Sequence, residues 1–241
     1  MDRPDADLAA AFEATWPPAR TVLCGGLEVG QGLGAGGRVS SARASGPWTP
    51  DDLAAAEAQH AAWGQPPLFR AWGDEGDLIA ALTDRGYVAD NPTLIMASPV
   101  AALTDRALPP VTAFAVWPPL AIQRQIWAAG NIGPARQAVM DLVPHPKAAL
   151  LGRLRDRAAG AGFVAIHGPV AMVHAVEVLE GFRRQGLAGW MMRQAAFWAA
   201  EQGASRIGLA VSRANRGAAA TYASLGFSPA GHYAYYLRPA G

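Results

Sequence analysis

The residues with the clearest chemical potential form a short basic turn between a predicted strand and a predicted helix. The turn reads RRQGLA over residues 183–188, after the apolar run 170–179 and before the amphipathic run 187–203. A helix that begins there points its unpaired N–H groups and the positive end of its dipole at the turn. Gly186 allows close approach of the backbone, and the two arginines supply forked donors for phosphate oxygens. The turn predicts a polyphosphate site, although a surface loop with two solvated arginines has the same composition.

A second motif follows this helix. Residues 205–211 alternate as in a strand with one better-buried face. The next segment, NRGAAATYASLGF over residues 215–227, predicts a helix that Asn215 caps and that Gly226 ends in a left-handed conformation. One face of that helix carries Ala218, Tyr222 and Leu225.

Together the patterns R-x-x-G-x-A and N-x-x-A-x-x-x-Y-x-x-L-G-F resemble the GNAT superfamily of acetyl-CoA-dependent N-acetyltransferases. The resemblance covers roughly residues 120–238, and the paired motifs are far more specific than either one alone. It implies a mixed α/β sheet and acetyl-CoA as acyl donor, with no metal. The positions that it assigns to the cofactor are Val176, Glu177, Val178, Arg183, Arg184, Gln185, Gly186, Leu187, Ala188, Gly189, Asn215, Ala218 and Tyr222.

The resemblance also indicates which residues move protons. It makes Tyr222 the acid that protonates the departing thiolate, with a packed core aromatic as the alternative. His174 matches a strand position where several family members carry a glutamate base, and the usual histidine pKa suits that task. Glu177 is the second candidate, to orient a water or bind the amine, and regular strand alternation places it on the face opposite His174. A core histidine, or a water chain that carries the proton to solvent, are the open alternatives.

The bulk composition excludes several classes of protein. Hydrophobic residues make up 51% of the 241 residues and charged residues 16%, which suits a packed core and argues against disorder. A net charge of +1 gives no electrostatic footprint for nucleic acid. Cys24 is the only cysteine, so an internal disulfide and a Cys-based zinc site are excluded. No metal-ligand spacing is found among His60, His145, His167 and His232.

The chain shows no membrane or export signal. The start, MDRPDADLAA, is acidic and lacks an apolar signal core. No run approaches the roughly 20 apolar residues that span a bilayer. We therefore expect a cytoplasmic protein without membrane partners.

The first half predicts a degenerate copy of the same fold without the phosphate turn. Its expected helices cover residues 6–16, 50–63 and 77–85, and its expected strands cover residues 21–29, 68–72 and 93–97. The last helix ends in Gly86-Tyr87, which echoes Gly226-Phe227 in the second half. An unrelated α+β domain is the alternative.

A glycine-rich run over residues 30–37 also fits phosphate-binding patterns. Both the six-residue turn and the dinucleotide fingerprint require a helix to begin immediately afterwards. The chain continues as RVSSARASGP, a poor helix sequence, so we predict a hairpin turn without a ligand.

We expect a degenerate domain over residues 1–105, a proline-rich linker over 106–119 and a catalytic domain over 120–241. In the catalytic domain the predicted helices cover residues 120–129 and 134–142, and the predicted strands cover 148–154, 162–166, 170–179 and 233–237. The resemblance places the acceptor under the first two helices. Residues 111–117 form a further candidate strand, one that bridges the sheets of the two domains.

The leading hypothesis is an acetyl-CoA-dependent N-acetyltransferase that transfers the acetyl group to a primary amine by direct attack on the thioester. The alternative is a non-catalytic module that binds or senses acyl-CoA. The acceptor, whether a small molecule or a peptide, and the oligomeric state are not specified by any motif.

Overall fold

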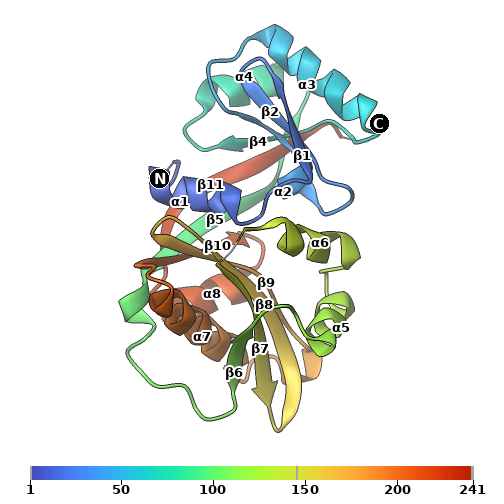
Figure 1. The fold of residues 1–241 in the computed structure, drawn as a ribbon. Helices are drawn as coiled ribbons and strands as arrows, with labels where there is room; N and C mark the ends of the chain where they lie inside the picture. The colour runs from blue at the N-terminus through green and yellow to red at the C-terminus, as the bar shows by residue number, and fades with distance from the viewer. Residues whose placement is uncertain (1, 145, 240–241) are drawn as a thin grey trace.

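The computed structural model describes residues 2–144 and 146–239, so His145 lies outside the described residues. Within them, one mixed eleven-stranded sheet runs the length of the molecule (Figure 1). Its strands are β1 (Arg20–Cys24), β2 (Leu27–Gln31), β3 (Ala42–Ala44), β4 (Leu68–Trp72), β5 (Val88–Pro99), β6 (Ala113–Val116), β7 (Lys147–Leu154), β8 (Arg157–His167), β9 (Val170–Val178), β10 (Arg206–Ser212) and β11 (Ser228–Leu237). The helices are α1 (Ala6–Ala14), α2 (Gly37–Ser40), α3 (Pro50–Ala62), α4 (Gly76–Asp84), α5 (Ala121–Ala129), α6 (Pro134–Leu142), α7 (Leu187–Glu201) and α8 (Arg216–Ser224), with 3-10 turns η1 (Val100–Ala102) and η2 (Glu180–Phe182).

The two halves exchange their last strands. The central order is β4-β11-β5-β10, so the final strand of each half, β5 or β11, lies between two strands of the other half. β11 pairs antiparallel with β4 and β5, and β5 pairs antiparallel with β10. The mixed α/β class is confirmed, and the two halves share a single sheet. The boundaries at 105 and 119 stay a prediction, but neither half completes its sheet without the other.

The strand expected over residues 111–117 has a different place. It forms β6, which pairs with β7 at the outer edge of the sheet. The bridge between the halves is made by β5 and β11 instead, because each has a long neighbour from the other half to pair with.

β9 and β10 separate partway along their length. Their parallel pairing runs from Val170 opposite Arg206 to Val173 opposite Leu209 and then stops. Just beyond this point Ala175 has a φ of +51°. A residue in that conformation inserts a bulge into the strand and bends it away from its neighbour. The two strands therefore diverge and leave a groove between them.

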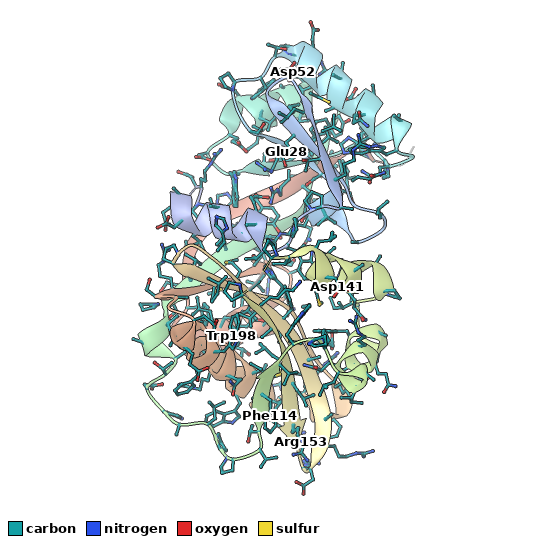
Figure 2. The ribbon with its side chains drawn as sticks, in the orientation of Figure 1. Glu28, Asp52, Phe114, Asp141, Arg153 and Trp198 are labelled. Atoms are coloured by element: carbon teal, nitrogen blue, oxygen red, sulfur yellow. The ribbon has the colours of Figure 1, made fainter. Side chains whose placement is uncertain are left out.

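Helices cover both faces of the second half, with α7 and α8 on one side and α5 and α6 on the other (Figure 1). Alternate β7 side chains point to opposite faces of the sheet. Leu150 packs in the core under α7, and Ala149 packs in the core under α5 and α6. Gly152 and Gly160 let α7 approach closely, because a Cβ at either would lie 2.6 Å from the sulfur of Met191. Side chains fill the space from Asp52 at the tip of the first half to Arg153 near the end of β7 (Figure 2).

Three local predictions need correction. The strand expected over residues 21–29 is the hairpin of β1 and β2, which turns at Gly25 with a φ of +58°. The strands expected over 93–97 and 162–166 extend into β5 and β8 because pairing on both sides supports the longer strands. The glycine run does lie between an antiparallel pair, β2 and β3, but a single helical turn, α2, begins at its last residue, Gly37, where the sequence predicted no helix.

Candidate active site

Two adjoining cavities open where β9 and β10 diverge. We call them the inner cavity, about 420 Å³, and the outer cavity, about 350 Å³. Both are lined by Val176, Glu177, Asn215, Ala218 and Tyr222. Because they share these walls, they form two ends of one groove.

The outer cavity lies against the basic turn. α7 begins after Gly186, which is left-handed at φ +81° and caps the helix with no side chain. Arg183 is half-exposed and folds back onto β9, where its Nε donates to the Val178 carbonyl at 2.8 Å and its Nη2 to Glu177 Oε1 at 3.0 Å. Arg155 holds the turn by donating to Gln185 Oε1 at 2.8 Å. The turn thus presents fixed positive charge and a helix start to the cavity.

Most of the predicted cofactor residues meet at this groove. Those that line it are Val176, Glu177, Val178, Arg183, Ala188, Asn215, Ala218 and Tyr222. The others shape the turn or the helix beneath it: Arg184 and Gln185 are exposed, Gly186 is the cap, Leu187 is buried in the core and Gly189 lies against Leu225. The sequence analysis missed Thr221, which lines the outer cavity from α8.

α8 aims Tyr222 at the groove. As predicted, Asn215 caps this helix, its Oδ1 accepting from the Ala218 N–H at 3.1 Å. The helix closes through a bond from the Phe227 N–H to the Tyr222 carbonyl at 3.1 Å, and the Phe227 ring packs against Tyr222. Burial raises the pKa of Tyr222 to about 12. Its hydroxyl therefore stays protonated at neutral pH and is available as a proton donor.

Glu177 stands on β9 just past the bulge, between both cavities. Its carboxylate lies close to the backbone of Gly130, where a Cβ would be 2.4 Å from Oε2. The prediction that Glu177 and His174 face opposite sides is wrong. The bulge shifts the register, so that His174 pairs with Phe163 and Glu177 with Ala161. Residues 161 and 163 point to one face of β8, and both β9 side chains line the inner cavity.

His174 is buried, and both of its ring nitrogens are engaged. Nδ1 lies 3.2 Å from Nη1 of Arg38, and Nε2 lies 2.8 Å from Oγ1 of Thr15. Because arginine only donates, Nδ1 accepts a hydrogen bond from Arg38. The ring proton is therefore on Nε2, which donates to Thr15 Oγ1. The Thr15 hydroxyl in turn donates a hydrogen bond to the Ala11 carbonyl at 2.6 Å. Burial, and then the charge of Arg38, hold the pKa of His174 well below its usual value.

This geometry argues against His174 as the general base. Its only lone pair already accepts from a guanidinium, so an incoming amine finds no free acceptor on the ring. Of the two candidate bases, Glu177 is the one at the junction of the two cavities.

The first half contributes to the inner cavity, which the sequence analysis did not anticipate. Its contributions are Trp16, Ala35, Gly36, Gly37, Arg38 and Asn91. The sequence predicts this glycine run to be a hairpin turn without a ligand, because a poor helix sequence follows it. It serves instead as a compact loop over the groove. Further walls come from Asn131, Ile132 and Arg136 at the α5–α6 joint and from Tyr235 of β11.

Two other findings concern the described residues only. Across residues 2–144 and 146–239, no three His, Cys, Asp or Glu side chains are grouped so that they could hold a metal ion. In the same part of the chain, no helix has the length and apolar character to cross a bilayer.

The chain thus combines a mixed sheet whose parallel pair β9 and β10 diverges, a basic turn at the start of α7 and a tyrosine on the next helix, α8. Residues 117–227 match the acetyltransferase (GNAT) family, and this part of the chain belongs to that family. No curated protein matches the sequence.

Solved structures share the fold across most of the chain. A GCN5-related N-acetyltransferase from Kribbella flavida is 22% identical, with a TM-score of 0.70 over 93% of this chain and 91% of that one. A tandem GNAT protein from the clavulanic acid biosynthesis pathway is 14% identical, with a TM-score of 0.60 over 81% and 74%. A GCN5-related N-acetyltransferase from Sphaerobacter thermophilus is 12% identical, with a TM-score of 0.57 over 79% and 68%. At these identities the likeness concerns the fold.

Proposed function

We propose that the protein is an acetyl-CoA-dependent N-acetyltransferase that acts on a primary amine. One observation carries the proposal: a single groove joins the basic turn before α7 to Tyr222 and Glu177. A donor with phosphates at one end and a thioester at the other fits such a groove.

The donor occupies the outer cavity. Its pyrophosphate lies over the amides that begin α7, with Arg183 beside it. Its pantetheine arm follows β9 beyond Val173, where pairing with β10 has ended and the strand edge is free for amide bonds. The thioester then reaches the shared walls of the two cavities.

The acceptor enters from the inner cavity as the neutral amine, and its nitrogen attacks the acetyl carbon. The C–N bond forms, the C–S bond breaks, and the nitrogen loses one proton. Glu177 takes that proton, directly or through a water, and Tyr222 gives its hydroxyl proton to the thiolate of CoA. The raised pKa of Tyr222 keeps this proton in place until the sulfur needs it.

The test is release of free CoA thiol from acetyl-CoA in the presence of a panel of amines. We expect release that depends on amine and that falls strongly in Tyr222→Phe. Binding of acetyl-CoA without release on any amine would instead favour the acyl-CoA sensor. No binding at all would refute both hypotheses.

A further inference from the structure

The part of the inner cavity that is not shared with the outer one carries positive charge. Two guanidinium groups line it, those of Arg38 from the first half and Arg136 from α6. The only acidic residue among the described lining residues is Glu177, at the shared end. The cavity is therefore dipolar, with a carboxylate near the thioester and two cations beyond it.

Arg38 is held in place by groups that do not neutralise it. Its guanidinium stacks 3.6 Å above the centre of the Phe12 ring, and Nη2 donates to the Phe12 carbonyl. Nη1 donates to His174, and the buried Nε has no hydrogen-bond partner. Burial is the main cause that lowers the pKa of Arg38, to about 10, so it is still charged at neutral pH.

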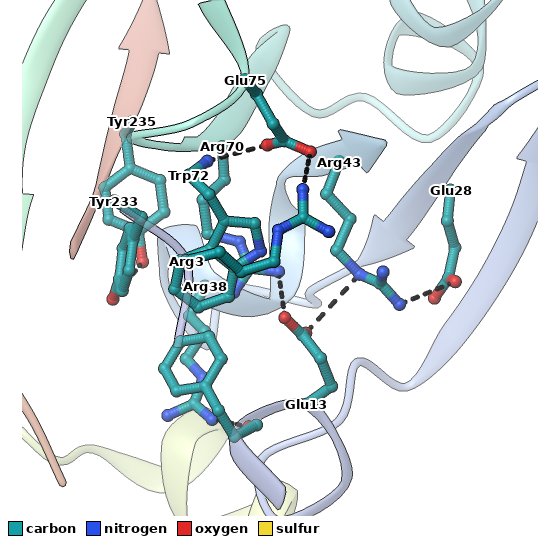
Figure 3. A network of polar contacts seen from close by, with 11 residues as sticks. Arg3, Glu13, Glu28, Arg38, Arg43, Arg70, Trp72, Glu75, Tyr233 and Tyr235 are labelled. Atoms are coloured by element: carbon teal, nitrogen blue, oxygen red, sulfur yellow. Dashed lines mark hydrogen bonds and ion pairs between the residues drawn. The ribbon is translucent and has the colours of Figure 1, made fainter. Parts of the chain in front are cut away.

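The neighbouring arginines differ from Arg38 in this respect. Arg43 and Arg70 both pair with Glu13, at 3.5 Å and 2.6 Å. Figure 3 shows these contacts and shows the guanidinium of Arg38 directed away from that carboxylate. Among the described residues, Arg38 makes no ion pair.

Arg136 reaches the same place from the other half. Its Nη1 donates to the Asn131 carbonyl at 3.0 Å. Its Nη2 rests against Gly36, where a Cβ would lie only 2.9 Å away. Gly36 also has a φ of +97°. Both this conformation and the close approach favour glycine at this position, so the loop can contact the guanidinium. Within the described part of the chain, Arg136 too makes no ion pair.

We propose that the acceptor is a small amine that also carries a carboxylate, such as an amino acid, and that Arg38 and Arg136 bind this carboxylate. The inference rests on the proposed acetyl transfer. Two arginines without a carboxylate partner suit an anion better than any neutral group. His174 and Glu177 pair with residues two apart on β8, so they stand roughly 7 Å apart on one face. That spacing suits an amine at Glu177 and a carboxylate at the guanidinium that His174 holds.

His174 is then a positioning residue. As a neutral acceptor it fixes Arg38, and its own proton is fixed by Thr15.

The test compares matched acceptors, amino acids and their α-amides, by CoA release in the wild type, Arg136→Gln and Arg124→Gln. Arg124 is the control, since it loses the same charge on α5 but does not line the cavity. We expect the wild type to favour the free acids by about 10- to 100-fold in kcat/KM. Arg136→Gln should remove most of that preference by raising the KM for the free acids. Arg124→Gln should retain the preference. Arg38→Gln should act like Arg136→Gln if the variant folds.

Equal use of acids and amides, or an equal loss for both in Arg136→Gln, would overturn the inference while the proposed transfer stands. If no amine releases CoA, the transfer itself fails. Calorimetric binding of N-acetyl amino acids and their amides then decides the anion site. Tighter binding of the acids that Arg136→Gln weakens supports it, and no such difference refutes it.

Discussion

The two halves of the chain build the same crossover and differ at the helix that completes it. β3 and β9 each pass through a helix to a parallel neighbour, β4 in the first half and β10 in the second. In the second half α7 begins after a bare Gly186 beside Arg183, and its first turn faces the outer cavity. In the first half α3 begins with Thr49-Pro50 and carries acids in its first turn.

Those acids close the first-half helix to any anion. Asp52 accepts from the N–H groups of Gly26 at 3.1 Å and Thr49 at 2.9 Å, and Pro50 has no N–H to offer. The Asp52 carboxylate therefore takes up the N–H groups that an anion would need, and it lies at the tip of the molecule (Figure 2).

The next helix repeats the comparison. α4 and α8 end with the same bond, from Tyr87 to the Leu82 carbonyl at 3.0 Å and from Phe227 to the Tyr222 carbonyl at 3.1 Å. Leu82 and Tyr222 thus occupy equivalent positions, but Leu82 is fully buried in the core and Tyr222 lines the groove. Glycines and apolar residues maintain the fold in both halves, and a few polar exchanges decide which half has a site.

The largest expected loss of activity comes from removing the hydroxyl of Tyr222, at the position where the first half has Leu82. Tyr222→Phe should lower kcat by about 10²- to 10⁴-fold with acetyl-CoA affinity unchanged, because only the proton donor is lost. Steady-state kinetics and calorimetry check this. Tyr236→Phe, a matched deletion of a hydroxyl within the first-half core, should have little effect on turnover. Normal turnover in Tyr222→Phe would remove Tyr222 from the mechanism.

Placing an acid in the first turn of α7, as in the first turn of α3, should make the second half resemble the first. Ala188 is the second residue of α7, as Asp51 is of α3. Ala188→Asp should weaken acetyl-CoA binding by about 10- to 100-fold through repulsion of the phosphates. It should not lower the melting temperature, since an acid suits a helix start. Ala188→Asn separates charge from size, and an equal loss in both variants would speak against a phosphate site.

A smaller loss of activity is expected when a neighbouring substitution moves the Glu177 side chain without removing its carboxylate. The Cβ of Gly130→Ala would collide with Oε2 of Glu177, so kcat/KM should fall about tenfold. The control is Gly133→Ala, because nothing lies within 4 Å of a Cβ there. A similar rate for both variants would show that the placement of Glu177 is unimportant.

The smallest effect concerns stability and the contact between the halves. His174 has a folded pKa well below the usual histidine value of about 6.5, so the unfolded chain takes up its proton first as the pH falls. The neutral His174 contributes fully to the free energy of unfolding above about pH 6.5. Below that pH this contribution is lost, and the free energy of unfolding falls by at most about 1.4 kcal/mol per pH unit. Denaturant titrations from pH 7.5 to 5 measure this. The slope should shrink in His174→Gln and persist in His167→Gln, which alters an exposed histidine.

The sequence predicted those features that depend on local rules. Asn215 as a cap, Gly226 as a helix stop and the turn before α7 follow from propensities and spacing, and all appear in the structure. Features that depend on pairing between distant segments did not follow. The exchange of β5 and β11 requires knowing which edges meet, and no local pattern encodes that.

The errors within the site have the same origin. A single residue with positive φ, Ala175, moved Glu177 to the face of His174. The role of Arg38 arises only when the fold brings α2 to Phe12 and His174, because both partners are distant from Arg38 in sequence.

The most direct measurement is the stoichiometry of acetyl-CoA binding, determined by calorimetry on the intact chain. The account predicts one molecule per chain, bound at the start of α7, because α3 is closed by its own carboxylate. Two molecules per chain would show that both crossovers bind the donor, and none would show that the basic turn does not bind it; either result would contradict the account.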